Sequence, residues 1–581
     1  MAERILTLLE VTGIQSYIFG SNQLAQNIGA SELVARATTK YIVDILGNQT
    51  NAFWDENQPD YGPGIQYDNN RSFDEIQAEV IYAGGGNAML LFHTMEKAVA
   101  FVKTLSRKLL KEAPGLKLVA AHKAYEHDHK AEDAKVLADE HHALRGELAH
   151  RKRDHVISAP LLGQSVTAEC VYTGLPAVGY DNDEKVVGEA AARKIKRMGK
   201  DYPARLISNE VKAKLEAESI GNERLHNVLP KVRQQKIQGR DFGFIYDFSE
   251  LGEPGESSYI AVVHADGNQM GKRFELIRNK HNSPDKNDAY IEDLRQFSLG
   301  VRKRAKRALE KTVQYIFDSL PNDKNWTMDS VFGGVVRIPK TKGGSPLLPF
   351  RPIVFGGDDI TFVCDGRLGL DLAAYYLNAF CEEDHAGEEI EGDRVYARAG
   401  IAVVKTHYPF SRAYDLAEAL AAQAKKAIID LKASGQQSAT VMDWHFATTG
   451  KMYELKEIRD REYRDNNAPK RSMLMRPVTL EENPATWRTW DIFTALMKEF
   501  QKSEWKGMRN KVLALRDALR QGETAVQLFI ANHNQVNDLP SIDGLKDMEK
   551  LGWQDNQCGY FDAIEAIDFF VSLDRKKEPA Q

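Results

Sequence analysis

Cysteine is scarce in this chain. The 581 residues include four cysteines, which lie far apart in the sequence: Cys170, Cys364, Cys381 and Cys558. No two of them form a C-x-x-C pair, which excludes a zinc ribbon or finger built from such pairs. Four isolated cysteines also exclude a secreted, disulfide-stapled framework.

Long hydrophobic runs and a strong excess of one charge are also missing. No apolar run approaches the roughly 18 residues that a membrane helix needs, and the first residues lack the basic and apolar regions of a signal peptide. The 77 basic and 83 acidic residues give a net charge of −6, which argues against a surface built throughout to coat nucleic acid. We therefore expect a cytoplasmic protein with no membrane partner.

What is present is a repeated pattern of strands and helices. In each copy a strand ends in a short turn, and a glycine-rich hairpin follows later in the chain. The first strand ends at Thr12-Gly13 and the second at Asp266-Gly267. The first hairpin turn is Gly84-Gly85-Gly86-Asn87 and the second is Gly356-Gly357-Asp358-Asp359. The second copy thus has three carboxylates where the first has none.

This order of elements predicts an α+β protein. The β-α-β-β-α-β pattern suits a ferredoxin-like palm, whose sheet would bring the strand ends together. Further patterns predict a helix from about 30 to 46, a loop over 50–75, and helices near 131–150 and 186–218. The expected domains are a degenerate first palm (1–125), a mainly helical linking region (126–250), a catalytic second palm (251–447) and a C-terminal helical domain (448–581).

The three carboxylates of the second copy indicate metal and phosphate chemistry. Asp358 and Asp359 share a hairpin tip, where they repel each other unless a cation bridges them. Asp266 ends a neighbouring strand and would face the same ions. Mg²⁺ or Mn²⁺ prefers carboxylate, water and phosphate oxygens, and two such ions can activate a 3′-hydroxyl and stabilise leaving pyrophosphate. Gly356 and Gly357 would let a triphosphate approach the backbone. The alternative is a solvated turn, since Gly and Asp are common in turns.

Several segments together resemble one known family, the large subunit of type III CRISPR effectors (the Cas-ten family). They are Gly13-Ile14-Gln15-Ser16-Tyr17-Ile18-Phe19, Gly29-Ala30-Ser31-Glu32-Leu33, Asp266-Gly267-Asn268-Gln269-Met270-Gly271, the stretch from Arg351 to Asp359, and Ala399-Gly400-Ile401-Ala402 leading to Ala417-Glu418 and Ala424-Lys425-Lys426. The resemblance covers about residues 1–125 and 255–445.

The resemblance implies two packed palms, of which the second joins ATP into cyclic oligoadenylates. It implies that Asp266, Asp358 and Asp359 hold the metal ions, and that a lysine at Lys425 or Lys426 meets the triphosphate. Gly267 would lie at the nucleotide with Gly356 and Gly357. Asn268 would bind a ribose or a metal-bound water, although asparagine is also common in turns.

The chain also departs from that family. It opens directly on the first palm, without the family's HD nuclease domain, and it lacks the zinc site between the palms. Asn268 stands where the family often has a second aspartate. The pattern therefore indicates a reduced homologue. Its partners would be nucleoside triphosphates, with RNA, effector subunits or further copies of the chain left open. The rival hypotheses are a binding subunit of an RNA-guided complex and a cyclase that uses GTP or mixed nucleotides.

Two other charged features invite a functional interpretation. The run from Arg302 to Arg307 could line a groove for RNA or nucleotide, but a solvated helix face is the favoured interpretation. His127, His129, His141 and His142 reproduce no metal-ligand spacing, and we expect structural roles for them.

Overall fold

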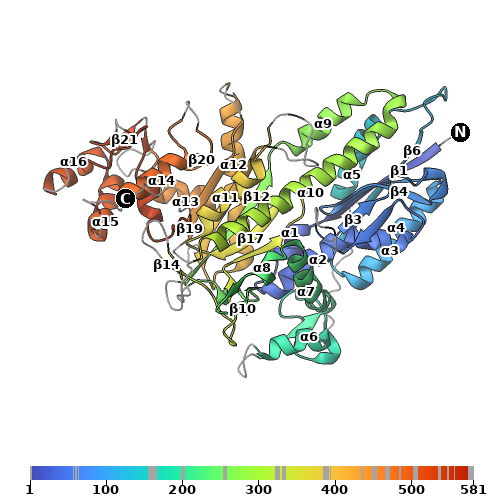
Figure 1. Cartoon of the computed structure of the whole chain (residues 1–581), viewed down its shortest axis with the longest axis horizontal. Coiled ribbons are helices and arrows are strands. Elements are labelled where there is room, and N and C mark those ends of the chain that lie inside the picture. Colours follow the sequence, from blue (N-terminus) through green and yellow to red (C-terminus); the bar gives the residue numbers. More distant parts are fainter. Residues whose placement is uncertain are drawn as a thin grey trace.

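The computed structural model describes most of the chain. It describes residues 3–573 apart from 57, 59–61, 63, 155–165, 198–202, 253–257, 321–326, 330–334, 384–391, 393, 434, 436–437, 448–453, 465–470, 483–485, 501–504, 506–507, 534–537, 546–547 and 555. In Figure 1 the N-terminal unit lies at one end and the C-terminal helices at the other, with the second β-rich unit between them.

The first unit is a four-stranded antiparallel sheet with helices on both faces. The strand order is β4-β5-β1-β6, the ferredoxin-like order that the pattern predicts. One face packs on α2, α3 and α4, and the other packs on α5. The elements are β1 (Glu3–Thr12), α1 (Ile14–Phe19), α2 (Leu24–Ala37), α3 (Lys40–Leu46), β4 (Ala78–Gly84), β5 (Asn87–Phe92), α4 (Met95–Glu112), β6 (Lys117–Glu126) and α5 (Leu137–Asp154).

The second unit repeats this arrangement and extends it. Its sheet has the order β16-β17-β12-β18-β19-β20, in which β18 and β19 are parallel. Helices α10 and α11 cover one face and α12 covers the other. The elements are β12 (Tyr259–Gly267), α9 (Met270–Lys280), α10 (Asn287–Asp318), β16 (Phe350–Val354), β17 (Ile360–Asp365), α11 (Gly369–Cys381), β18 (Ala397–Lys405), α12 (Phe410–Ala433), β19 (Val441–Ala447) and β20 (Val478–Thr479).

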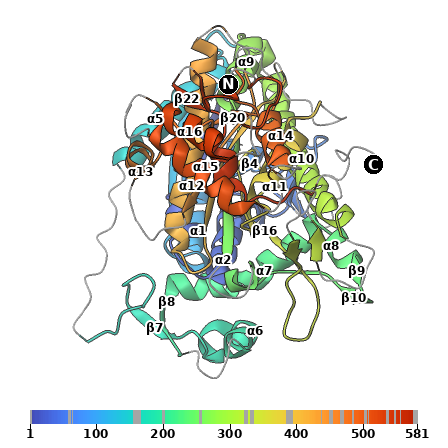
Figure 2. The ribbon, with the colours of Figure 1, turned by 90° about the vertical axis from the view of Figure 1, so that its left-hand side faces the viewer.

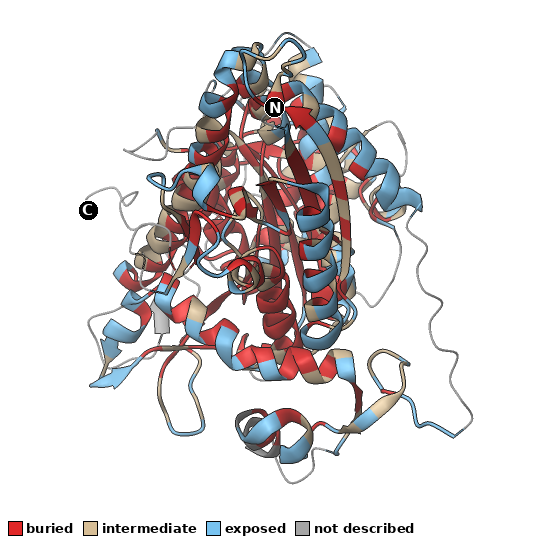
Figure 3. Cartoon of the chain, turned by 90° about the vertical axis from the view of Figure 1, so that its right-hand side faces the viewer, coloured by how far each residue is buried: buried red, intermediate tan, exposed pale blue. Residues whose placement is uncertain are grey.

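The central strands read as nearly unbroken apolar runs because both sheet faces are covered. In β12, Ile260 and Val262 join the core beneath α12, and Ala261 and Val263 join the core on the opposite face. Figure 3, viewed from the side of the first palm, shows buried strands behind helices whose outer faces are exposed. The predicted α+β palm architecture is thereby confirmed.

The two palms pack against each other through equivalent helices. Helix α2 of the first palm contacts β16 of the second, and the long α10 of the second contacts β4 and α5 of the first. The two hairpin turns thus come to opposite sides of one cleft.

A linking segment and a C-terminal segment complete the described chain. In Figure 2, α6 and the small β7–β8 sheet project beneath α7. The linking elements are β7 (Ala177–Tyr180), α6 (Glu184–Arg197), β8 (Leu206–Ser208), α7 (Asn209–Val228), α8 (Lys231–Gln234), β9 (Lys236–Ile237), β10 (Arg240–Asp241), β11 (Gly243–Phe244) and η2 (Phe248–Glu250). The C-terminal elements are α13 (Leu455–Glu462), α14 (Trp490–Glu499), α15 (Arg509–Gln521), α16 (Glu523–Asn532), β21 (Trp553–Gln554), β22 (Gln557–Cys558) and α17 (Phe561–Ala566). No helix among the described residues is long and apolar enough to cross a membrane.

Several local predictions were wrong. The helix predicted over 30–46 is broken between α2 and α3, where the Thr39 hydroxyl donates to the Ala35 carbonyl at 2.6 Å, a side-chain bond that competes with helical hydrogen bonding. The helix predicted over 186–218 is two helices with β8 between them, because Pro203 cannot continue a helix.

The loop predicted over 50–75 contains a two-stranded sheet and a short helical turn. Its elements are β2 (Ala52–Asp55), β3 (Gly64–Tyr67) and η1 (Phe73–Glu75). Further small elements occur in the second palm: η3 (Pro284–Lys286), β13 (Thr327–Asp329), β14 (Val335–Arg337) and β15 (Leu347–Leu348). Side chains of α10 hold the 50–75 segment, since Arg302 donates to the Gly62 carbonyl at 3.0 Å.

Candidate active site

The three predicted carboxylates converge at one corner of the second palm. Asp266 is the penultimate residue of β12, while Asp358 and Asp359 form the turn between β16 and β17. Strand β12 pairs with β17 as far as Ala265 and Ile360, so the turn lies beside the end of β12. The Gly267 amide donates to the Asp358 carbonyl at 3.2 Å and fixes this contact.

Burial, followed by crowding of negative charge, shifts the pKa values of the carboxylates at this corner. Burial and the neighbouring carboxylates of Asp266 and Asp359 raise the pKa of Asp358 to about 7. Burial, and then Asp266, raise the pKa of Asp359 to about 7 as well. The Asp359 side chain is nevertheless 48% exposed, so water reaches it and part of the repulsion is screened. A bound cation would relieve the remainder.

An arginine pairs with the third carboxylate. Arg398 of β18 stands directly opposite Asp266 in the β12–β18 register. One guanidinium nitrogen forms an ion pair with Asp266, and another donates to the Asn268 side-chain oxygen at 2.8 Å. Asp266 is thus neutralised by a side chain, while Asp358 and Asp359 are not.

Further polar side chains surround Asp359. The His264 Nδ1 atom lies 3.3 Å from its Oδ1 atom. Burial lowers the pKa of His264, so this imidazole is neutral at pH 7. Glu418 of α12 raises the pKa of Asp359 and accepts a hydrogen bond from Gln15 of the first palm at 3.1 Å. A residue of the first palm therefore contacts the acidic corner of the second.

The acidic turn opens into a cleft of about 340 Å³ between the palms. The glycine turn of the first palm, Gly84 to Asn87, lines the same cleft as Gly356 to Asp359. A Cβ atom built on Gly84, Gly85, Gly356 or Gly357 would meet nothing within 4 Å. Both turns therefore offer bare backbone to a ligand.

Basic side chains line the cleft on the side of the helices. Arg36, Arg224, Arg302 and Lys306 all contribute to its lining. Arg36 and Arg224 each form an ion pair with buried Glu32 at 2.6 Å, and the Arg224 guanidinium lies 4.3 Å from the Phe355 ring centroid. The cleft therefore combines an acidic corner with a basic wall, the charge pattern expected for a metal–phosphate ligand.

The basic run of α10 does not form the solvated face that the sequence favoured. Arg304 is fully buried and donates to the Phe380 and Glu382 carbonyls at 2.7 Å. Lys306 lines the cleft and pairs with Glu310 at 2.7 Å. Helix α10 thus uses charged side chains in its contacts with both palms. The charge pattern of the sequence alone does not reveal this.

A divalent cation fits this corner through two carboxylates. Among the described residues no group of three or more His, Cys, Asp or Glu side chains is arranged to hold a metal ion, in agreement with the pairing of Asp266 with Arg398. Mg²⁺ commonly takes only one or two protein carboxylates and completes its shell with water and substrate phosphates. Asp358 and Asp359 supply such a pair, and the Asp359 Oδ1 atom is a buried oxygen without a hydrogen-bond partner.

A family comparison identifies the domain that carries this corner. Residues 259–430 match the model of the Cas10/Cmr2 second palm domain. The chain therefore contains a Cas10/Cmr2 second palm. This confirms the predicted resemblance to the large subunit of type III CRISPR effectors. A search of curated proteins found no match.

Solved structures with similar folds include three forms of Csm1. A Csm1–Csm4 cassette in complex with AMPPNP and one in complex with cA3 are each 14% identical, with a TM-score of 0.46. Each alignment covers 98% of this chain and 70% of the other. Csm1 from T. onnurineus is also 14% identical, with a TM-score of 0.45 and the same coverage of both chains.

The predicted site residues of the Cas10/Cmr2 palm do not all lie in the cleft. Gly267 and Asn268 lie beside the acids, and Asn268 is 5% exposed. Lys425 and Lys426 are exposed on α12, and neither lines the described inter-palm cleft; Lys426 lines a separate hollow with Asp430 and Arg488. Contact between these lysines and a triphosphate stays a prediction.

Sequence reasoning missed Arg398, His264 and the electrostatic effect of Glu418 on Asp359. A signal for His264 was available, because residues two apart on a strand share a face and His264 precedes Asp266 by two. No comparable signal exists for Arg398. Only the strand register shows that it faces Asp266. His127 and His141 have structural partners, Asp288 and Tyr290, at 2.9 and 2.8 Å.

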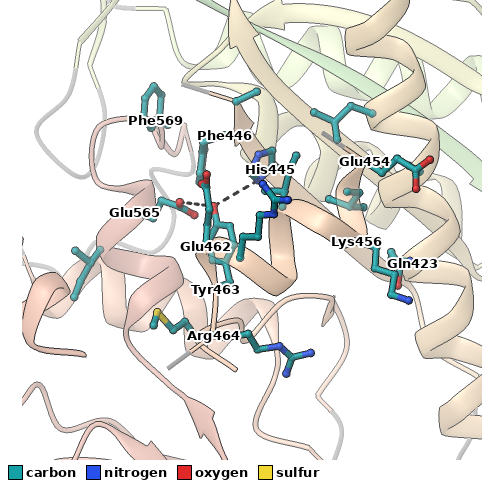
Figure 4. Close-up of a pocket in the computed structure, with 18 of the residues that line it drawn as sticks. Gln423, His445, Phe446, Glu454, Lys456, Glu462, Tyr463, Arg464, Glu565 and Phe569 are labelled. Carbon is teal, nitrogen blue, oxygen red and sulfur yellow. Dashed lines mark hydrogen bonds between the residues drawn. The ribbon is translucent and has the colours of Figure 1, made fainter. Parts of the chain in front are cut away.

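A separate cavity of about 880 Å³ lies between α12, the end of β19 and the C-terminal helices. Figure 4 shows Tyr463 in its wall, between Glu565 and His445. The Tyr463 hydroxyl donates to Glu565 at 2.6 Å and lies 3.5 Å from His445 Nδ1. Burial, with Arg476 and Arg459 nearby, lowers the pKa of His445 to about 3. These hydrogen bonds link His445 of β19, through Tyr463, to Glu565 of α17.

Proposed function

We propose that the second palm is a nucleotidyltransferase that joins ATP into cyclic or linear oligoadenylates, as a signal in CRISPR-type antiphage defence. The observation that carries the proposal is the inter-palm cleft of a Cas10/Cmr2 palm, in which the acidic turn at Asp358 and Asp359 faces a second glycine turn at Gly84 to Asn87. Two facing turns suit two nucleotides, one donor and one acceptor.

The backbone of the acidic turn supports a close approach of phosphate. Gly356 has a φ of +108°, which side chains rarely adopt, and the space beside Gly356 and Gly357 is open. A side chain at Gly356 would strain the turn, and one at either glycine would stand between the backbone and a triphosphate. This is the role proposed for both glycines.

The proposed reaction is the attack of one 3′-hydroxyl on the α-phosphorus of the other ATP. The hydroxyl oxygen forms the new phosphodiester bond, its proton is released, and the α–β bond breaks to release pyrophosphate. Asp358, Asp359 and the substrate phosphates would hold two Mg²⁺ or Mn²⁺ ions. These ions would neutralise the negative charge of the phosphates and lower the pKa of the attacking hydroxyl. The protein contributes mainly by positioning and by electrostatics.

Other residues of the cleft would orient the nucleotides. Arg302 and Lys306 on α10 would offset phosphate charge from the basic wall, as point charges and donors do. Asn268, held by Arg398, would place its amide near a ribose or an ion-bound water. Lys425 or Lys426 would reach the triphosphate from α12 in the proposed complex.

The test is turnover of labelled nucleotides. The purified full chain is incubated with each α-³²P nucleoside triphosphate and Mg²⁺ or Mn²⁺, and products are separated by chromatography. We expect a phosphodiester product from ATP that falls at least about 100-fold in the double variant Asp358→Asn/Asp359→Asn, the scale of losing charge stabilisation at a reacting centre. The exposed Asp74→Asn serves as a matched control. Undiminished synthesis by the double variant would refute the site.

The same assay separates the rival hypotheses. A product from GTP or from a mixture would identify a different base. No product with any nucleotide, together with RNA that copurifies, would favour a binding subunit of an RNA-guided assembly. The mass of the chain in solution, measured by light scattering, shows whether copies associate.

A further inference from the structure

Arg398 occupies a position set by the sheet rather than by chance contact. Strands β12 and β18 pair antiparallel, and Asp266 and Arg398 are directly opposed. Opposed side chains on one sheet face are the closest cross-strand neighbours. The guanidinium bridges Asp266 and Asn268, and its side chain is only 13% exposed. Such a bridge is held in place by two partners and by burial.

The guanidinium also acts on the rest of the acidic corner. It lowers the pKa of Asp359, in opposition to Asp266 and Glu418. Three ionised carboxylates and one guanidinium carry a net charge of −2. Without Arg398 the same three acids would carry −3 and would all face one space. A divalent cation would then find three ligands instead of two.

The first palm offers an internal comparison. In the equivalent register of β1 and β6, Lys117 stands opposite Thr12. A basic residue thus occupies the same place in both palms, but only in the second does it face an acid. Pairing with an acid therefore does not alone explain why a basic residue stands at this position. Lys117 provides a matched position at which a positive charge can be removed without changing the acidic corner.

We propose that Arg398 is the resident counter-ion of Asp266 and competes with divalent cations for it. In the nucleotide-free protein, divalent cations would bind only through Asp358 and Asp359, and weakly. Arg398 would release Asp266 when nucleotide phosphates arrive and offer the guanidinium another anion. Arg398 is then a positioning residue that couples metal binding to substrate binding. The inference rests on the proposed function, whose site it concerns.

The test measures Mn²⁺ binding without nucleotide. Free Mn²⁺ is followed by electron paramagnetic resonance during titration of the full chain at pH 8. We expect Arg398→Gln to bind Mn²⁺ about tenfold more tightly than the natural protein, the lower end of what changes beside metal ligands produce. Lys117→Gln in β6 and Arg394→Gln in the segment before β18 remove the same charge elsewhere and should leave the affinity within about twofold.

Two further variants keep the test decisive. Adding Asp266→Asn to Arg398→Gln should abolish the gain, because the freed ligand is then missing. Arg398→Lys keeps the charge and should bind Mn²⁺ nearly as weakly as the natural protein. Unchanged affinity in a folded Arg398→Gln protein, or a gain that survives Asp266→Asn, would overturn the inference.

The outcome is separable from that of the proposed function. Tighter Mn²⁺ binding in Arg398→Gln with no nucleotide turnover in any form would support the counter-ion and refute the nucleotidyltransferase. Turnover by the natural protein with no change in Mn²⁺ affinity would do the reverse.

Discussion

At the scale of single residues, Asp358 and Asp359 are held in a place that disfavours their charged forms. Each has a pKa raised to about 7, whereas an ordinary aspartate titrates near 4. Between about pH 4 and pH 7 the folded chain therefore binds more protons than the unfolded chain, so these groups make the fold less stable as the pH rises. The ionised forms of Asp358 and Asp359 thus lower the free energy of unfolding, and pKa values shifted in this way are common at functional sites.

This sign gives a prediction for the metal-free protein. In EDTA, Asp358→Asn/Asp359→Asn should melt at a higher temperature than the natural chain at pH 8, and the gap should shrink towards pH 5. Because Asp359 is half exposed, water screens the repulsion, and we expect a gap of the order of 2 °C. Scanning calorimetry at both pH values measures it, with Asp74→Asn as control. A variant that melts lower at pH 8 would show that the acids stabilise the fold.

At the scale of elements, α12 packs on β18 at a glycine. A Cβ atom on Gly400 would lie 2.0 Å from the Ala417 carbonyl oxygen and 2.4 Å from the Ala421 amide. Backbone cannot yield as a side chain can, so the helix would have to move away from the sheet. This explains in physical terms why residue 400 of β18 is a glycine.

Gly400→Ala should therefore destabilise the protein by about 3 kcal/mol or more, at the upper end of overpacking effects. Urea unfolding followed by tryptophan fluorescence measures the loss. Gly357→Ala is the matched control, since its Cβ atom would meet nothing within 4 Å and should change stability by less than about 0.5 kcal/mol. Equal stability of the two variants would mean that α12 is free to shift.

Sequence reasoning predicted elements well where a local signal was strong. The hairpins at 84–87 and 356–359 follow from glycine turns between apolar runs. Strand β19 was not predicted, although Val441 to Ala447 is mostly apolar. Its parallel pairing with β18 depends on the whole α12 crossover, and no local pattern encodes that.

The candidate site was predictable to the same extent and for the same reason. Asp266, Asp358 and Asp359 could be found because each stands at a turn after a strand. Arg398 lies 132 residues beyond Asp266, and only the antiparallel register brings the two together. A cleft lined by Arg302 and Lys306 was only the less favoured interpretation of the run from Arg302 to Arg307, because the sequence does not show which elements pack against a charged helix.

At the scale of the whole molecule, the C-terminal helices and the palms share one hydrophobic core. That core runs from Leu6 and Leu8 of the first palm through Val263 of the second to Phe493 of α14. The last described residues also join it, since the Val571 and Leu573 amides donate to Arg367 and Asp371 of the second palm at 2.9 and 3.0 Å. The C-terminal segment is thus integrated with the palm beside it.

A buried arginine ties these parts together. Arg476 is fully buried, pairs with Asp562 and Glu565 of α17 at 3.7 and 3.0 Å, and lies 5.5 Å from the Trp444 ring centroid of β19. Arg476→Met would leave two acids without a cation in the core. We expect a loss of about 3–5 kcal/mol in unfolding free energy, the usual cost of breaking a buried pair from one side.

The control is an ion pair of the same segment at the surface. Arg509 and Asp568 pair at 2.5 Å with side chains 63% and 41% exposed, so Arg509→Met should cost less than about 1 kcal/mol. If the core is shared, loss of α17 packing would unfold the palm as well. Arg476→Met should then lower by the same amount the urea midpoint of the change in Trp fluorescence and the urea midpoint for loss of nucleotide binding in the cleft. Two separated transitions, with the cleft intact through the first, would instead show that the C-terminal helices fold as the independent domain that the sequence predicts.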